Sequence, residues 1–458
     1  MTATLTSVET NEEPPQGSVE VNKIERRRWA ILAVLCLAVF VTVLDGTIVN
    51  VALPTLAIEL GASTRQLQWI VDAYLLVFTG LLLAAGGLGD KYGRKKALIF
   101  GLVVFGITSA IAGSAGSANE LILGRALMGV GAAFIFPATL AILTNVFTDV
   151  GERAKAIGIW SAVSGIAVAA GPITGGWLLE QAWWGSVFFV NVPVVIFAVV
   201  ATVVMVPDSK EANAPKLDLA GIGLSIAAIT ALVFTIIEAP EWGWTSATTL
   251  IGFTVSGLLL TAFIAWELHT PRPMLPVRIF QNRRFSAASV SVTSAFFALF
   301  GFVFLVTQYF QLIQGYSPFE AGVRTLPVAF AIAISSVMAP RLVDRLGTTR
   351  VVTSGLGLMA VTFVWISTVT ATTSYLEIVG QMILLGTGLG LTTAPATESI
   401  MGSLSLGKAG VGSAVNDTTR ELGGTLGVAI VGSVFSSVYI GALDDAEVVN
   451  QLPPEAQE

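Results

Sequence analysis

The sequence of 458 residues is poor in charge, cysteine and histidine. Only 12% of its residues are charged, against roughly 25% in soluble domains, and 54% are hydrophobic. One cysteine, Cys36, and one histidine, His269, cannot form a disulfide or a Cys/His metal site. The net charge of −6 is spread over loops and tails, which argues against a nucleic-acid surface. These shortages exclude most soluble classes and indicate a polytopic membrane protein.

Long apolar runs recur along nearly the whole chain. A helix needs about 20 residues to cross a hydrocarbon core of about 30 Å. Backbone polar groups must find internal partners there, and runs of this length without strict alternation find them as helices. The sequence therefore predicts an all-α protein with thirteen spans, at residues 29–57, 67–88, 97–116, 120–146, 154–178, 184–206, 218–238, 248–267, 286–312, 319–343, 350–371, 374–400 and 410–438.

Lysine and arginine occupy every second connection between these runs, and Arg65 is the clear exception. Cytoplasmic loops retain such residues, so we expect a multi-pass protein of the cell membrane with a cytoplasmic N-terminus. The alternative of a cleavable signal peptide is disfavoured, because the first run is too long and no small-residue cleavage site follows it.

The chain contains one internal repeat. GGLGDKYGRKKAL, with Asp90 and Gly93, matches PRLVDRLGTTRVV, with Asp344 and Gly347, at an offset of 254 residues. LMGVGAAFIFPATLAI similarly matches LLGTGLGLTTAPATESI. Because the period is eight helices, the simplest arrangement is two six-helix halves separated by two extra helices. Parallel repeats of this kind are typical of the major facilitator fold.

This arrangement predicts five regions in the chain. The C-terminal half has only five predicted spans, because the residues after Tyr439 are polar and too few to cross a bilayer. The regions are an N-terminal tail (1–28), a six-helix half (29–206), two linker helices with their loops (207–284), a second half (285–440) and a polar tail (441–458).

Four motifs resemble the signatures of the fourteen-helix drug:proton antiporter family of the major facilitator superfamily. They are LDGTIVNVALP, GGLGDKYGRKKAL, LILGRALMGVGAA and GIWSAVSGIAVAAGPITGG. The resemblance implies a monomeric transporter that exports lipophilic small molecules against a proton gradient, without ATP or a cofactor. The chain departs from the family in lacking a fourteenth helix and in WWGSVFFVNVP, which keeps Asn191 and Pro193 but has no arginine.

Two of the motifs are rich in glycine. In the fifth run, small residues around a proline are typical of close helix packing, and the resemblance links this motif to antiport. Its residues are Gly158, Gly171, Pro172, Gly175 and Gly176. The second motif resembles a cytoplasmic gate between the halves, whereas a simpler reading is a tight turn with retained basic residues. Its residues are Gly86, Asp90, Gly93 and Arg94, repeated as Asp344 and Gly347.

Ionisable residues within the spans are the candidates for proton coupling and substrate binding. A charged aspartate in mid-membrane costs several kcal/mol, so Asp45 must face a cavity, pair with a cation or be protonated. A structural hydrogen bond is the alternative. Asp72 lies about one turn from Trp69, and an aromatic ring beside a carboxylate suits a lipophilic cation. Arg125 is a lone cation, and the resemblance ties it to proton coupling.

Asp417 and Glu421 are four residues apart and therefore share one face at the start of the last span. They are either coupling residues or part of a solvated cytoplasmic turn. GSLSLGKA, from Gly402, resembles a phosphate-binding loop but lacks its final Ser/Thr and a preceding soluble strand, so ATP is not expected.

The sequence thus predicts a proton-coupled exporter of lipophilic cations. The alternatives are a transporter of the same fold for an endogenous metabolite, or a transport-inactive membrane protein that acts as a partner or regulator.

Overall fold

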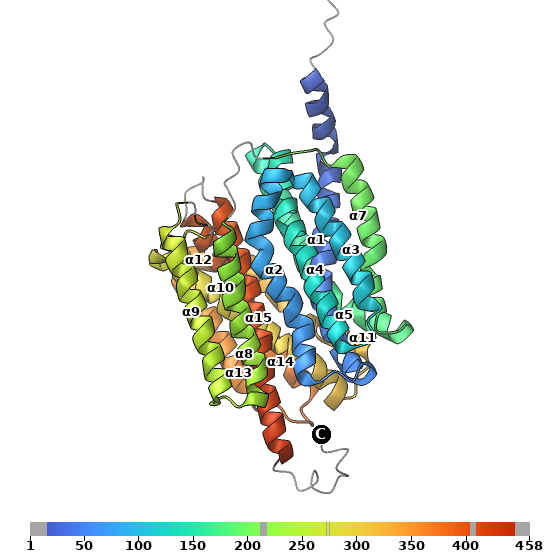
Figure 1. Ribbon diagram of the computed structural model, residues 1–458, viewed down its shortest axis with the longest axis vertical. Helices are drawn as coiled ribbons and strands as arrows, with labels where there is room; N and C mark the ends of the chain where they lie inside the picture. Colours follow the sequence, from blue (N-terminus) through green and yellow to red (C-terminus); the bar gives the residue numbers. More distant parts are fainter. Residues whose placement is uncertain (1–15, 211–217, 272, 274, 404–408, 445–458) are drawn as a thin grey trace, which may run out of the picture.

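The computed structural model describes residues 16–210, 218–271, 273, 275–403 and 409–444. Parts of the predicted tails and of the GSLSLGKA turn lie outside these ranges. The described residues form a bundle of helices (Figure 1). The first seven are α1 (Gln16–Glu59), α2 (Thr64–Tyr92), α3 (Arg94–Gly113), α4 (Ala118–Val146), α5 (Val150–Gln181), the short α6 (Ser186–Phe189) and α7 (Asn191–Met205).

Two further helices connect these seven to the last group. They are α8 (Leu219–Trp242) and α9 (Ala247–His269), at the positions predicted for the linker helices. The last group comprises α10 (Arg283–Gln308), α11 (Pro318–Arg324), α12 (Leu326–Leu346), α13 (Thr348–Ile366), α14 (Tyr375–Gly402) and α15 (Ala409–Asp444), with a 3-10 turn, η1 (Val277–Gln281), before α10 and a π-helix, η2 (Tyr309–Ile313), after it.

Twelve spans in the described part are long and apolar enough to cross a membrane, and α2, which bends by 50° between Leu82 and Ala84, is a thirteenth candidate. This confirms the all-α prediction and its thirteen spans. Three predicted spans are each built from two helical segments: α6 with α7, α10 with η2, and α11 with α12.

Matched glycines reveal the internal repeat in three dimensions. Gly93 ends α2 with φ +118°, and Gly347 ends α12 with φ +83°, a region that residues with a Cβ rarely adopt. A Cβ on Gly101 of α3 would lie 2.8 Å from the carbonyl oxygen of Gly131 in α4. A Cβ on Gly355 of α13 would lie 2.6 Å from that of Gly388 in α14. The same close helix pair is therefore built twice.

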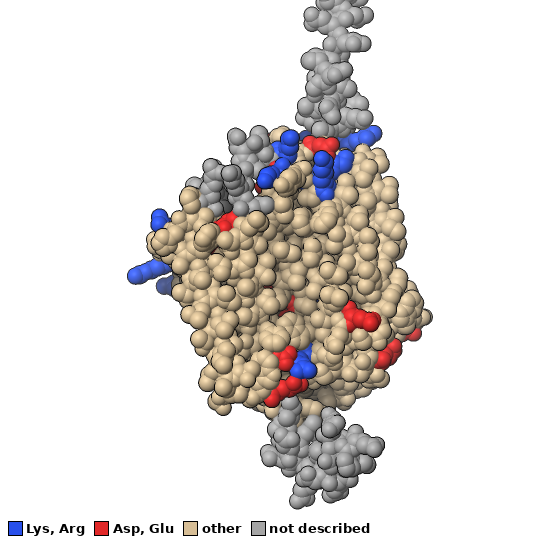
Figure 2. Space-filling view, viewed as in Figure 1, with Lys and Arg blue, Asp and Glu red and all other residues tan. Residues whose placement is uncertain are grey.

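The two ends of the bundle differ in charge. Figure 2 shows lysine and arginine gathered at one end and aspartate and glutamate toward the other. We call the end where α2 joins α3 and α4 joins α5 the basic end. The opposite end, where α1 joins α2 and α3 joins α4, is the acidic end.

The helices pack as two groups joined by α8. Helices α1 to α7 share one large core, which also includes Phe304 of α10 and Val428 of α15, and smaller cores hold α10 to α15 together. Between the groups, α2 packs on α15, and α5 packs on α11. α8 contacts both α2 and α15, while α9 packs on α8.

Candidate functional site

A buried ion pair lies at the centre of the first group. Asp45 of α1 and Arg125 of α4 are both fully buried, and Arg125 Nη1 donates to Asp45 Oδ2 at 2.5 Å. The other carboxylate oxygen, Oδ1, accepts from Asn191 Nδ2 of α7 at 2.8 Å. Asp45 therefore has both oxygens satisfied, and its charge is compensated by a cation.

The arginine is fixed by groups from a third helix. Its Nε donates to the carbonyl oxygen of Ile70 in α2 at 3.0 Å, and its guanidinium lies 4.3 Å from the ring centroid of Tyr74. The hydroxyl of Tyr74 in turn donates to the carbonyl oxygen of Thr42 at 3.1 Å. A cation over a desolvated aromatic face is stabilised by the ring quadrupole.

Asn191 extends the network to α3. Its Nδ2 also donates to Ser109 Oγ at 3.1 Å, and Ser109 donates to the carbonyl oxygen of Phe188 at 2.8 Å. Sequence analysis identified Asp45 and Arg125 separately and noted Asn191, but it missed Tyr74 and Ser109. A tyrosine or serine in an apolar run carries no sequence signal that distinguishes a network member from a packing residue.

Asp72 has a different environment, although it is equally buried. Neither of its oxygens has a hydrogen-bond partner among the described residues. Trp69, one turn earlier, packs against Phe234 of the linker helix α8, with ring centroids 5.9 Å apart. Gln68 donates from Nε2 to the carbonyl oxygen of Ala429 in α15. Asp72 thus occupies the side of α2 that faces α8 and α15.

Asp417 and Glu421 both lie in α15, within its apolar stretch Val415–Tyr439, and are partly buried. A polar cluster surrounds them. Arg420 Nη2 donates to Thr397 Oγ1 of α14 at 3.3 Å, and Thr397 donates to Asn416 at 3.0 Å. The structure therefore places the two carboxyls in a helix of the second group, with a cation between them in sequence.

The glycine motif of α5 is packed at one end of the helix and open at the other. A Cβ on Gly171 or Gly175 would meet α1 at Ile48, and a Cβ on Gly176 would clash with the backbone of Phe319 in α11. The carbonyl of Pro172 in α5 lies against Gly322 of α11. By contrast, a Cβ on Gly158 or on Gly165, both nearer the basic end, would meet nothing within 4 Å.

The motif that joins α2 to α3 forms a local ion pair. Arg94 Nε donates to Asp90 Oδ1 at 2.8 Å, and the backbone N–H of Arg94 donates to the carbonyl oxygen of Ser209. A Cβ on Gly86 would touch Pro137 of α4 at 3.4 Å. Asp90 and Pro137 lie in α2 and α4 of the first group, and Ser209 lies in the segment after α7. Asp344, the repeat counterpart of Asp90, is exposed.

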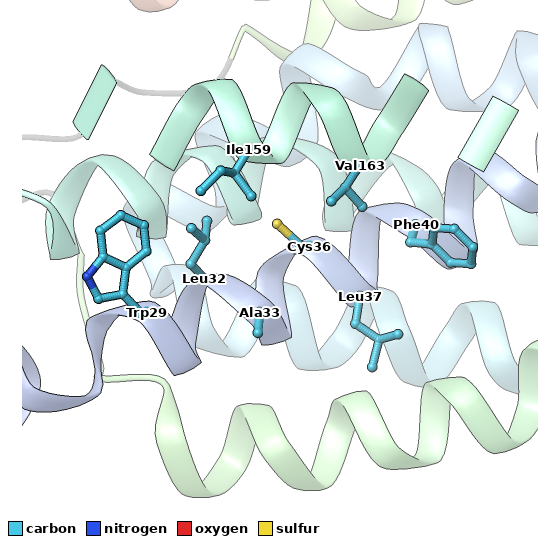
Figure 3. Close-up of a pocket in the computed structure, with 8 residues that line it drawn as sticks. All are labelled: Trp29, Leu32, Ala33, Cys36, Leu37, Phe40, Ile159 and Val163. Atoms are coloured by element: carbon cyan, nitrogen blue, oxygen red, sulfur yellow. The ribbon is translucent and has the colours of Figure 1, made fainter. Parts of the chain in front are cut away.

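A shallow apolar groove of about 470 Å³ lies between α1 and α5. Figure 3 shows it lined by Trp29, Leu32, Ala33, Cys36, Leu37, Phe40, Ile159 and Val163. Cys36 precedes Asp45 by nine residues, which is two and a half helical turns, so the two side chains leave α1 on opposite sides. The groove is therefore separate from the buried ion pair.

The described residues contain no group of three or more His, Cys, Asp or Glu side chains that could hold a metal ion. What the charged groups can do is take up protons and attract cations. Among the described residues Asp72 has no hydrogen-bond or ion-pair partner, Asp45 is paired with Arg125, and Asp417 and Glu421 lie on the same helix as Arg420.

The architecture and the intramembrane charges define a helical membrane transporter. The model of the Major Facilitator Superfamily matches residues 35–428, and the chain belongs to this family. It is 37% identical to the methyl viologen resistance protein of Salmonella typhimurium, over 91% of this chain and 84% of that protein.

Two further comparisons agree with this assignment. The chain is 33% identical to a multidrug efflux pump of Mycolicibacterium smegmatis, over 94% of this chain and 85% of that protein. It also superposes on a bacterial homologue of the human lysosomal transporter Spinster, with a TM-score of 0.65 and 16% identity over 93% of this chain and 85% of that one. The protein is therefore a multi-pass transporter of the major facilitator fold.

Proposed function

We propose that the protein exports lipophilic cations in exchange for protons, by alternating access across the cell membrane. The observation that carries this proposal is Asp72, a fully buried carboxyl group without a hydrogen-bond partner among the described residues. A buried charge of this kind is costly, and the cost is relieved when the carboxyl group binds a proton or a cation. One site that accepts either ligand in turn couples their movements.

The choice of substrate class follows from charge and from relatives. One relative is named for resistance to methyl viologen, a bipyridinium dication, and another is named as a multidrug efflux pump. The candidate residues inside the spans comprise four carboxyl groups, Asp45, Asp72, Asp417 and Glu421, and two cations, Arg125 and Arg420. This excess of negative charge favours cationic substrates over anionic ones.

The packing of α5 supports one state of the transport cycle. Glycines near the acidic end are in contact with α11, whereas Gly158 and Gly165 near the basic end are uncovered. Gln311 of the π-helix donates to the carbonyl oxygen of Val51 across the two groups at 2.8 Å, near the acidic end. We take the structure as the state open at its basic end, and we propose from the distribution of lysine and arginine that this end faces the cytoplasm.

In this state Asp45 is neutralised by Arg125, so a proton can bind to Asp45 only when the arginine moves away. Asp72 has no such requirement. We therefore assign the first proton exchange to Asp72, and to Asp417 and Glu421 in the second group, with the Asp45–Arg125 pair responding to the conformational change. A monomer contains all of these groups.

The test is substrate-induced proton release from proteoliposomes that contain the purified protein, with methyl viologen as the probe. We expect protons to be released when the probe is added, and the signal to vanish in Asp72→Asn. Asp208→Asn is the matched control, because Asp208 is exposed in the loop after α7. A folded wild-type protein that binds the probe without moving protons would refute the coupling, and Asp72→Asn with wild-type proton release would refute the role of Asp72.

A further inference from the structure

The linker helix α8 follows α2 closely over the part of α2 nearest the acidic end. Three contacts mark three levels: Gly80 with Ile226, Trp69 with Phe234, and Arg65 with Glu238. As residue numbers fall along α2 they rise along α8, as expected for two antiparallel helices in continuous contact. α8 therefore covers one side of α2 along this stretch, in addition to connecting the two groups of helices.

The same stretch of α2 also faces α15. Gln68 Nε2 donates to the carbonyl oxygen of Ala429 at 3.1 Å and to Ser433 Oγ at 3.2 Å. Leu76 shares an apolar cluster with Val233 of α8 and with Ala429. Helices α2, α8 and α15 thus meet in one junction.

One side of α2 within this junction carries a line of polar residues. Arg65, Gln68, Asp72 and Thr79 are spaced by three, four and seven residues, which keeps them on one helical face. Gln68, Asp72 and Thr79 are buried, and Gln68 Oε1, both oxygens of Asp72 and Thr79 Oγ1 have no hydrogen-bond partner among the described residues. Buried polar atoms are normally satisfied, so a line of such atoms indicates groups that exchange partners during function.

The facing side of α15 continues the line toward the basic end. Glu421, Thr425, Ala429 and Ser433 follow at intervals of four residues, and Thr425 and Ser433 are buried. Thr79 lies eleven residues beyond Gln68, about 16 Å along α2. Because α15 is antiparallel to α2 and Ala429 and Ser433 lie beside Gln68, this places Thr79 about level with Glu421.

The line is capped at the acidic end. Arg65 Nη1 donates to Glu238 Oε2 at 2.9 Å and also contacts Glu241, so both acidic partners come from α8. Trp244, in the turn after α8, donates from Nε1 to Ser437 Oγ of α15 at 3.0 Å. The ion pair ties α8 to α2, and the tryptophan ties the turn after α8 to α15.

We infer that the linker helix α8 is the outer seal of a proton path to Asp72, closed by the Arg65–Glu238–Glu241 cluster. The charged groups around the path are Arg65 on α2, Glu238 and Glu241 on α8, and Asp417, Arg420 and Glu421 on α15. With the seal closed, α8 keeps lipid and external water away from the junction. Asp72 meets external protons only when α15 and the linker separate from α2. This inference rests on the proposed proton coupling and gives the two linker helices a part in it.

The first experiment measures proton entry into proteoliposomes without substrate, under an imposed membrane potential, with a pH-sensitive dye inside. The wild type should be tight. Arg65→Gln, and separately the pair Glu238→Gln with Glu241→Gln, should raise the rate of proton entry several-fold. Adding Asp72→Asn to either variant should abolish the increase. The matched control is Glu377→Gln, which removes an acidic group at the acidic end of α14, away from α8.

A leak that depends on Asp72 upholds the seal. The inference would be overturned if the variants of the Arg65–Glu238–Glu241 cluster admitted protons as slowly as the wild type. It would also be overturned if the faster proton entry persisted after Asp72→Asn was added. The result is independent of the proposed substrate, because no substrate is present. If the wild type released no protons on addition of methyl viologen, the proposed function would be refuted. The inference about the seal would still be tested separately, by the rate of proton entry without substrate.

A second measurement, which requires no transport activity, reports directly whether Asp72 is reached from outside. The only cysteine is Cys36, so Cys36→Ser provides a background for Asp72→Cys. A charged, membrane-impermeant thiosulfonate added outside should label Asp72→Cys several-fold faster once Arg65→Gln is introduced. Equal labelling rates for Asp72→Cys with and without Arg65→Gln would contradict the inference.

Discussion

The buried pair of Asp45 and Arg125 allows a quantitative prediction that is asymmetric between the partners. Removing one partner of a buried ion pair costs about 3–5 kcal/mol, because the other is left as an uncompensated charge. An arginine cannot lose its proton in a protein, whereas an aspartate can become neutral by gaining one. Asp45→Asn should therefore lower the free energy of unfolding more than Arg125→Gln does.

The double variant Asp45→Asn with Arg125→Gln should be more stable than Asp45→Asn alone. It buries no uncompensated charge at this position, and the remaining loss is that of charge-assisted hydrogen bonds, about 1.5–3 kcal/mol. The coupling energy between the two substitutions should accordingly be about 2 kcal/mol or more.

The assay is unfolding in mixed micelles with increasing sodium dodecyl sulfate, followed by tryptophan fluorescence. Arg125→Gln should also lose less stability at acidic pH than at neutral pH, since protonation removes the unpaired charge of Asp45. Additive effects in the double variant, or a larger loss for Arg125→Gln than for Asp45→Asn, would refute the argument from charge. Asp45→Asn should in addition abolish uphill export, which the proteoliposome assay checks at matched protein levels.

Four further substitutions probe the packing of α5, the ion pair after α2 and a contact between the two groups. Gly176→Ala should slow transport strongly, because its Cβ would clash with the backbone of α11, while Gly158→Ala, with open space around it, should transport like the wild type; both are compared by uptake into inverted vesicles. Asp90→Asn should lower turnover and leave equilibrium substrate binding within a few-fold, since its bond to Arg94 lies at the basic end and away from the carboxyl groups of the spans; unchanged turnover would contradict this. Gln311→Ala should shift the population toward the state open at the acidic end by about fivefold, equivalent to one neutral hydrogen bond of about 1 kcal/mol, which double electron–electron resonance between spin labels on the two groups would detect.

The sequence was sufficient to predict the helices, because span length and apolar composition are local properties. It also identified Asp45 and Arg125 as unusual in their surroundings. That the two touch depends on α1 and α4 lying side by side, although the partners are 80 positions apart in the sequence. No local pattern carries that information.

Other features had a local signal with two meanings. The glycines of α5 predicted close packing, yet only those near the acidic end are in contact, because a neighbouring helix lies against that part of α5 alone. Trp69 was expected beside a substrate, and the structure places it against Phe234 of α8; its role in binding stays a prediction. The linker helices looked like a simple insertion, since the acidic partners of Arg65 are more than 170 residues away.

The closure at the acidic end has a consequence for speed. Few polar bonds cross between the two groups there: Gln311 with Val51, Gln68 with Ala429 and Ser433, and the N–H of Phe319 with Glu180. Each such bond contributes about 1 kcal/mol, and the glycines beside them bring backbones together without interlocking side chains. Opening this end therefore breaks few polar bonds, although it must also separate apolar contacts such as that of Leu76 with Ala429. A motion of this kind fits the microsecond to millisecond range of domain movements.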